Sequence, residues 1–128
     1  MSKKLFIVFL LQLIAIKAGA DENSPYAWAH ALTLESVTNL KGGVAEGTRN
    51  LANLDLSLAI DTQAAGWWSD GNIFIYALGN YGKAPSDLTG DLQTISNIQT
   101  DNNLKLYEFW YEHSFANGAV KLLAGLHD

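Results

Sequence analysis

Hydrophobic and polar residues alternate with a period of two over several segments of this chain, a pattern typical of strands with two unlike faces. The clearest case is the stretch 52–61, where alanine, leucine and isoleucine take the even positions while polar residues take most odd positions. The segment 104–115 repeats the pattern, since an aromatic row on odd positions alternates with Glu108, Trp110 and Glu112. The apolar faces are expected to contact a core or lipid, and the polar faces water.

Five strands follow from this pattern and from the turn residues between them. They are expected over residues 27–39, 52–61, 72–81, 104–115 and 119–127. The connections are a glycine-rich charged loop, a turn with two adjacent tryptophans, a long polar loop with room for one helical turn, and Ala-Asn-Gly. These connections cover residues 41–50, 62–71, 82–103 and 116–118. Asn-Gly favours a hairpin because both residues tolerate positive φ. The sequence therefore predicts an all-β fold, an antiparallel up-and-down meander.

The first twenty residues have the order of a secretory signal. Lys3 and Lys4 precede an apolar run over 5–16, which ends in small residues at 18–20. The run is shorter than the roughly 20 residues that a membrane-spanning helix needs. We therefore expect a signal-peptide helix over 1–20, cleaved after Ala20, and one mature domain over 21–128.

Charge and cysteine content narrow the classes of partner. Without residues 1–20, five basic residues remain against thirteen acidic ones, a formal charge of −8. Nucleic acid is excluded as a partner on that balance. The chain has no cysteine, so an exported domain of this composition must be stabilised by a sheet, a membrane or an assembly rather than by disulfides.

Long and short connections alternate along the meander, as they do in outer-membrane barrels, whose short turns are periplasmic and whose long loops are external. The loops over 41–50 and 82–103 would then be external. On the same topology four aromatic residues fall near the periplasmic interface, where aromatic rings are enriched. These are Trp28, Trp67, Trp68 and Phe115.

Catalytic and metal chemistry finds little support in the sequence. Glu108 and Glu112 lie four residues apart on one strand, roughly 13 Å, whereas glycosidase pairs are separated by about 5 to 9.5 Å. His30, His113 and His127 have no metal-ligand spacing. No phosphate-binding loop or nucleophile elbow occurs. We therefore expect no enzyme activity, no cofactor and no metal site.

Several ordered motifs resemble one family. GGxxxGTxxLxNLDL over 42–56, NxGxxPS over 80–86, GDLQxxSNI over 90–98 and LYExWxE over 106–112 are similar to the carbohydrate-selective porins of bacterial outer membranes, the OprB-type family. The resemblance implies a sugar-permeable barrel of sixteen strands, of which this chain would be the N-terminal portion. Five strands are fewer than the smallest common barrel of about eight.

The expected function is passive diffusion of mono- or oligosaccharides across the outer membrane, in contact with its lipid. A homo-oligomer is left open. The residues expected along the sugar path are polar or aromatic and lie on the polar faces of two strands: Asn53, Asp55, Ser57, Glu108, Trp110 and Glu112. Two alternatives remain, a secreted sugar-binding β-sandwich and a secreted glycoside hydrolase. Detergent-dependent solubility separates the porin from both.

Overall fold

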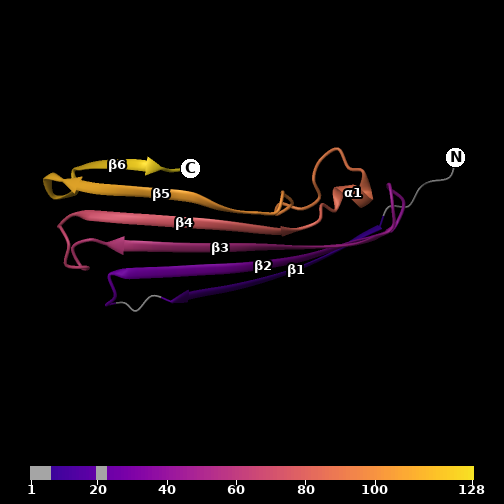
Figure 1. Ribbon diagram of the computed structural model, residues 1–128, viewed down its shortest axis with the longest axis horizontal. Helices are drawn as coiled ribbons and strands as arrows, with labels where there is room; N and C mark the ends of the chain where they lie inside the picture. Colours follow the sequence, from indigo (N-terminus) through magenta and orange to yellow (C-terminus); the bar gives the residue numbers. More distant parts are fainter. Residues whose placement is uncertain (1–6, 20–22) are drawn as a thin grey trace. The chain divides into compact units, whose positions relative to one another are not determined.

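The computed structural model describes residues 7–19 and 23–128, the first range for its backbone alone. Six strands form one open sheet in which each strand lies beside its neighbour in the chain (Figure 1). The strands are β1 (Ile7–Gly19), β2 (Tyr26–Lys41), β3 (Gly47–Asp61), β4 (Gly71–Gly82), β5 (Asn103–Phe115) and β6 (Val120–Leu126). A short helix, α1 (Ser86–Thr89), lies between β4 and β5, and the 3-10 turn η1 (Ala116–Gly118) joins β5 to β6. None of the helices in the described ranges is long and apolar enough to cross a bilayer.

The predicted antiparallel meander is confirmed, with β2 to β6 in place of the five expected strands. The loop predicted over 41–50 is shorter than expected, because β2 continues to Lys41 and β3 begins at Gly47. Gly42 and Gly43 have φ values of 89° and 67°, a left-handed conformation that glycine adopts without strain. The turn between β2 and β3 is therefore confined to residues 42–46.

The prediction of a helix within residues 1–20 is wrong for the described part of this range, because Ile7–Gly19 forms strand β1 beside β2. Isoleucine and valine recur in this run, and such β-branched residues favour strands. The edge of β2 also offers unpaired backbone groups that a strand can satisfy. The expected cleavage site after Ala20 lies outside the described residues, and export of the chain remains a prediction.

The chain forms two compact units. Of the described residues, the first unit comprises 7–15, Leu32–Leu54 and Gly79–Asn103. The second unit comprises 16–19, 23–31, Asp55–Leu78 and Leu104–Asp128. Strands β2, β3 and β4 contribute residues to both units. The two long loops predicted to be external fall in the first unit, and the four predicted interface aromatics fall in the second.

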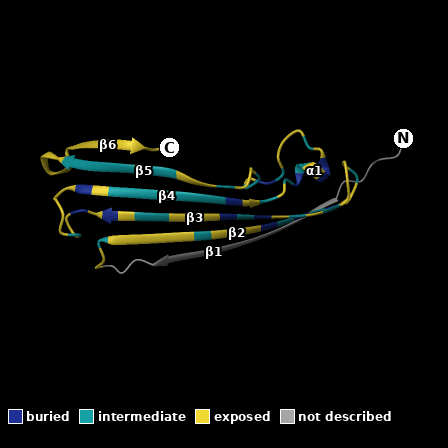
Figure 2. Ribbon diagram, in the orientation of Figure 1, coloured by how far each residue is buried: buried dark blue, intermediate teal, exposed yellow. Residues whose placement is uncertain are grey.

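Burial in the first unit alternates along its strands (Figure 2). On β2 the odd positions Glu35, Val37 and Asn39 are buried, whereas Leu34 and Leu40 are 41% and 53% exposed. In a sheet with one face on a water-excluded core, the leucines would be the covered residues. Here the leucine face is the one left open.

The second unit contains the β5–β6 hairpin. Its turn has positive φ at Ala116, Asn117 and Gly118, which confirms the hairpin that Asn-Gly predicts. In the ladder Trp110 pairs with Gly125. A Cβ atom at Gly125 would lie 2.3 Å from the Phe109 carbonyl oxygen and 2.7 Å from the Trp110 Cα. Only glycine therefore fits opposite this tryptophan.

Candidate functional site

The side chains predicted to line a sugar path are all buried or half-buried. Asn53, in the first unit, is buried, while the other five are in the second unit and half-buried. Between the polar residues of β3, Leu54 and Leu56 are 38% and 41% exposed. The alternation that the sequence predicts for β3 is therefore present over residues 53–57. It is wrong at the end of the strand, where Ile60 is buried and Ala59 and Asp61 are exposed.

Asp55 on β3 is connected to β4. The Tyr76 hydroxyl donates a hydrogen bond to Asp55 Oδ1, so Tyr76 lies on the same face as Asp55 and Ser57. The Tyr76 ring also lies edge-on to that of Tyr107, with centroids 5.3 Å apart. The sequence predicts Tyr107 in the apolar aromatic row of β5. In the structure its ring instead contacts Tyr76, a residue of the polar face, and its hydroxyl donates a hydrogen bond to Asp128.

Trp110 is the centre of an aromatic and acidic cluster in the second unit. Its Nε1–H donates to Glu108 Oε2 at 2.8 Å, and its ring lies 5.1 Å from that of Phe74 and 5.9 Å from that of His127. Glu112, two residues further on, accepts a hydrogen bond from Lys121 Nζ at 3.0 Å. Carboxylates that accept hydrogen bonds thus lie beside aromatic rings.

Sequence reasoning missed four members of this face: Phe74, Tyr76, Lys121 and His127. Both faces of β4 are apolar in sequence, so the sequence does not show which residues of β4 share a face with Trp110 and Asp55. The contacts of Phe74 with Trp110 and of Tyr76 with Asp55 decide this. On β6 the polar residues Lys121 and His127 are an even number of positions apart, which was the available signal for a shared face.

A second aromatic cluster follows the odd positions at the end of β5. The Trp68 Nε1–H donates to the Tyr111 hydroxyl at 2.7 Å, and ring contacts continue through His113 to Phe115. Trp67 lies against Trp68, and the two rings are 51% and 48% exposed. Three of the four predicted interface aromatics therefore belong to one cluster, while Trp28, on β2, is 56% exposed.

In the first unit the connection between β4 and β5 is held against β2. Asn39 Nδ2 lies 2.8 Å from the carbonyl oxygens of Gly42 and Ala45 and 3.2 Å from that of Leu88. The backbone N–H groups of Val44 and Ala45 also donate to Leu88 O. Since Asn39 is on the odd face of β2, α1 lies on the face that carries Glu35 and Val37.

Hydrogen bonds within the same connection fix its fold. Asp91 accepts from the hydroxyls of Thr89 and Ser86. The Thr89 bond, more than the Ser86 bond, lowers the pKa of the Asp91 carboxyl below its ordinary 3.8. The Gln99 amide donates to Ser86 Oγ at 2.8 Å. The helical turn predicted in this loop is confirmed as α1, with Gly90 as its left-handed C-cap.

Comparisons with protein-family models, with curated proteins and with solved structures find no match to the chain. Within residues 23–128, no three side chains of His, Cys, Asp or Glu converge into a metal site. The function must therefore be argued from the geometry of the two faces.

The Trp110 cluster has the chemistry of a carbohydrate-contacting surface. An indole face can pack on the C–H face of a pyranose, and the Glu108 and Glu112 carboxylates can accept hydrogen bonds from its hydroxyls. Lys121 adds a donor beside these acceptors, because its ammonium has three N–H groups and donates one of them to Glu112.

Proposed function

We propose that this chain is part of an outer-membrane porin that allows carbohydrates to diffuse passively through a polar lumen. The lumen is formed by the face that carries Asn53, Asp55, Ser57 and the Trp110 cluster. The opposite face contacts lipid. Transport involves no chemical step, since the solute exchanges water for side-chain hydroxyls, amides and carboxylates along the path.

One observation carries the proposal: around Asn39 on β2, over residues 53–57 of β3 and over residues 108–110 of β5, polar side chains and Trp110 are covered while the neighbouring leucine and phenylalanine side chains are exposed. In the first unit, Asn39 is 1% exposed and Leu40, its neighbour, 53%. In the second unit, Phe109 is 51% exposed, whereas its neighbours Glu108 and Trp110 are half-buried. An apolar face of this kind is a liability in water and is the lipid-facing surface of a barrel strand.

The aromatic cluster supports the same orientation. Trp67, Trp68 and Phe115 lie at the turn ends of strands, and tryptophan side chains favour the membrane interface because the ring is apolar while its N–H needs a partner. The Trp68 N–H has such a partner in Tyr111. These residues then mark the periplasmic side of the barrel.

Cysteine labelling tests the orientation of β3. Single cysteines at positions 53 to 57, probed in intact outer membranes with a small charged thiol reagent, should label at Asn53, Asp55 and Ser57. Leu54 and Leu56 should stay unlabelled because lipid covers them. Uniform labelling, or labelling of the leucine positions alone, would contradict the lumen assignment.

Planar bilayers test transport itself. The full-length porin of which this chain is proposed to be part, purified in detergent, should insert and conduct ions, and mono- and disaccharides should reduce the current as they occupy the path. Soluble behaviour without detergent, together with sugar binding and no conductance, would instead identify the sugar-binding β-sandwich. Release of reducing sugar from an oligosaccharide would identify a hydrolase.

A further inference from the structure

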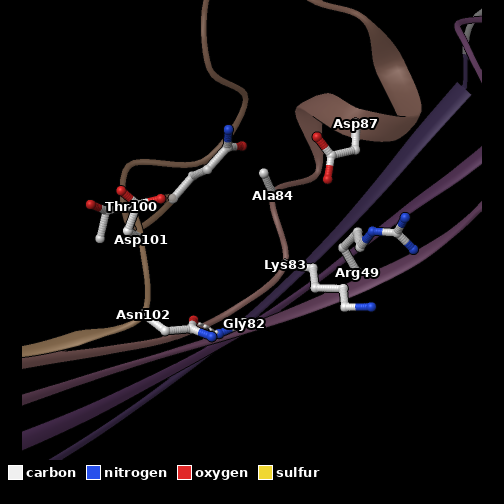
Figure 3. A pocket seen from close by; sticks show the side chains of 9 residues that line it. Arg49, Gly82, Lys83, Ala84, Asp87, Thr100, Asp101 and Asn102 are labelled. Carbon is white, nitrogen blue, oxygen red and sulfur yellow. Dashed lines mark hydrogen bonds between the residues drawn. The ribbon is translucent and has the colours of Figure 1, made fainter.

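A polar cleft opens in the first unit beside the connection that follows β4. It encloses about 730 Å³, within the range of roughly 300–1,000 Å³ typical of small-molecule sites. Its polar lining consists mainly of Arg49, Lys83, Asp87, Gln99, Asp101 and Asn102. In Figure 3, Arg49 and Lys83 lie on one side of the cleft, and Thr100 and Asp101 on the other.

The two cations of this cleft form no ion pair with any side chain of residues 23–128. Among residues 23–128 the ion pair within 4.0 Å is Lys121–Glu112, so Arg49 and Lys83 are each farther than that from Asp87. Arg49 donates one long hydrogen bond, from Nη1 to Thr48 O at 3.3 Å. Its buried Nε–H has no acceptor in the described part of the chain. A guanidinium without an ion pair favours an added carboxylate.

The other side of the cleft presents groups suited to hydroxyls. Asp101 and Thr100 are exposed, and a carboxylate and a hydroxyl can both accept hydrogen bonds there. Asn102 accepts the Gly82 N–H through Oδ1 at 2.7 Å, which leaves its NH₂ as a donor. The Gln99 amide, by contrast, is engaged with Ser86. Hydroxyl-binding and carboxylate-binding groups therefore line the same cavity.

We propose that this cleft binds a polyhydroxylated monocarboxylate, a sugar acid, with the carboxylate on Arg49 and Lys83 and the hydroxyls on Asp101 and Asn102. The proposal rests on the proposed function, because it assigns a preferred class of solute to the same channel. A neutral sugar uses only the hydroxyl-binding side. A simple carboxylate uses only the cationic side.

Binding to the full-length protein in detergent micelles tests this assignment without requiring transport. Titration calorimetry at low ionic strength, where charge interactions are least screened, should show D-glucuronate binding about tenfold more tightly than either D-glucose or acetate. Arg49→Gln and Lys83→Gln should each reduce glucuronate binding about threefold to tenfold and leave glucose unchanged. Asp87→Asn should tighten glucuronate, since it removes a like charge. Lys41→Gln, outside the cleft, is the matched control.

Each result decides between the claims. Equal affinity for glucuronate and glucose, or glucuronate affinity unaffected by Lys83→Gln, would overturn the cleft assignment; Lys83 is exposed, so this variant keeps the fold. Acetate binding as tightly as glucuronate would overturn the hydroxyl contacts. Conductance without a preference for glucuronate would refute the cleft alone, whereas glucuronate binding without conductance would refute the porin alone.

Discussion

Asn39→Ala tests how the connection between β4 and β5 is held on the polar face. The side chain is 1% exposed, and its Nδ2 group reaches the carbonyl oxygens of Gly42 and Ala45 at 2.8 Å each. The third acceptor, Leu88 O, is at 3.2 Å and also receives two backbone N–H groups, so it stays satisfied in the variant. The loss therefore concerns two short hydrogen bonds and the space left by a buried amide.

At about 1 kcal/mol net for each bond, with an added contribution from the lost packing, the attachment should weaken by about 2 to 3 kcal/mol. This corresponds to a roughly 30- to 140-fold larger population of the detached connection. The backbone amides of Val44 and Ala45 report it directly, because both donate to Leu88 O. Their hydrogen exchange should accelerate by the same factor.

Thr38→Ala is the matched control. Thr38 neighbours Asn39 on β2 but lies on the opposite face, where its hydroxyl is 2.9 Å from that of Thr48. Its removal should leave exchange at Val44 and Ala45 within a fewfold range. If Asn39→Ala changes exchange at these two amides no more than Thr38→Ala does, the side chain does not hold the connection, and the argument from its hydrogen bonds is refuted.

Three further predictions concern other parts of the chain. Gly125→Ala should destabilise the hairpin in urea unfolding by roughly 3 kcal/mol or more, because Gly125 has a φ of 136° and an added Cβ would make contacts under 3.0 Å. Gly118→Ala, whose Cβ would meet nothing within 4 Å, should cost about 1 kcal/mol. Equal losses of stability in the two variants would exclude the clash. Because folding lowers the Asp91 pKa, the Asp91 carboxylate contributes fully to the stability of the loop above pH 3.8, and this contribution is lost as pH falls through the lowered pKa. Hydrogen exchange at the Gly90 amide should therefore rise in that pH range in the native chain, and Asp91→Asn should remove this pH dependence. Trp110→Ala should weaken sugar block of the current about fivefold, from roughly 1 kcal/mol of aromatic contact, while Trp28→Ala should not; unchanged block would remove Trp110 from the path.

Local chemistry allowed the meander to be predicted. Period-two alternation placed Leu54 and Leu56 opposite Asp55, because successive side chains on a strand point to opposite faces whatever surrounds them. Asn117 and Gly118 predicted the hairpin turn because both residue types tolerate positive φ wherever they occur. Glu108, Trp110 and Glu112 were assigned to one face for the same reason.

Pairings between distant segments required the tertiary structure. The phase of β4 was decided by the Tyr76–Asp55 hydrogen bond, since Ile, Phe and Tyr on both faces give no period. The apolar run at Ile7–Gly19 suits a helix or a strand by composition, and the neighbouring β2 edge decides for a strand. Leu88 is attached to Asn39, which lies 49 residues earlier in the chain, and Arg49 and Lys83 line one cleft. Both arrangements depend on how the chain folds back, which residue spacing alone does not encode.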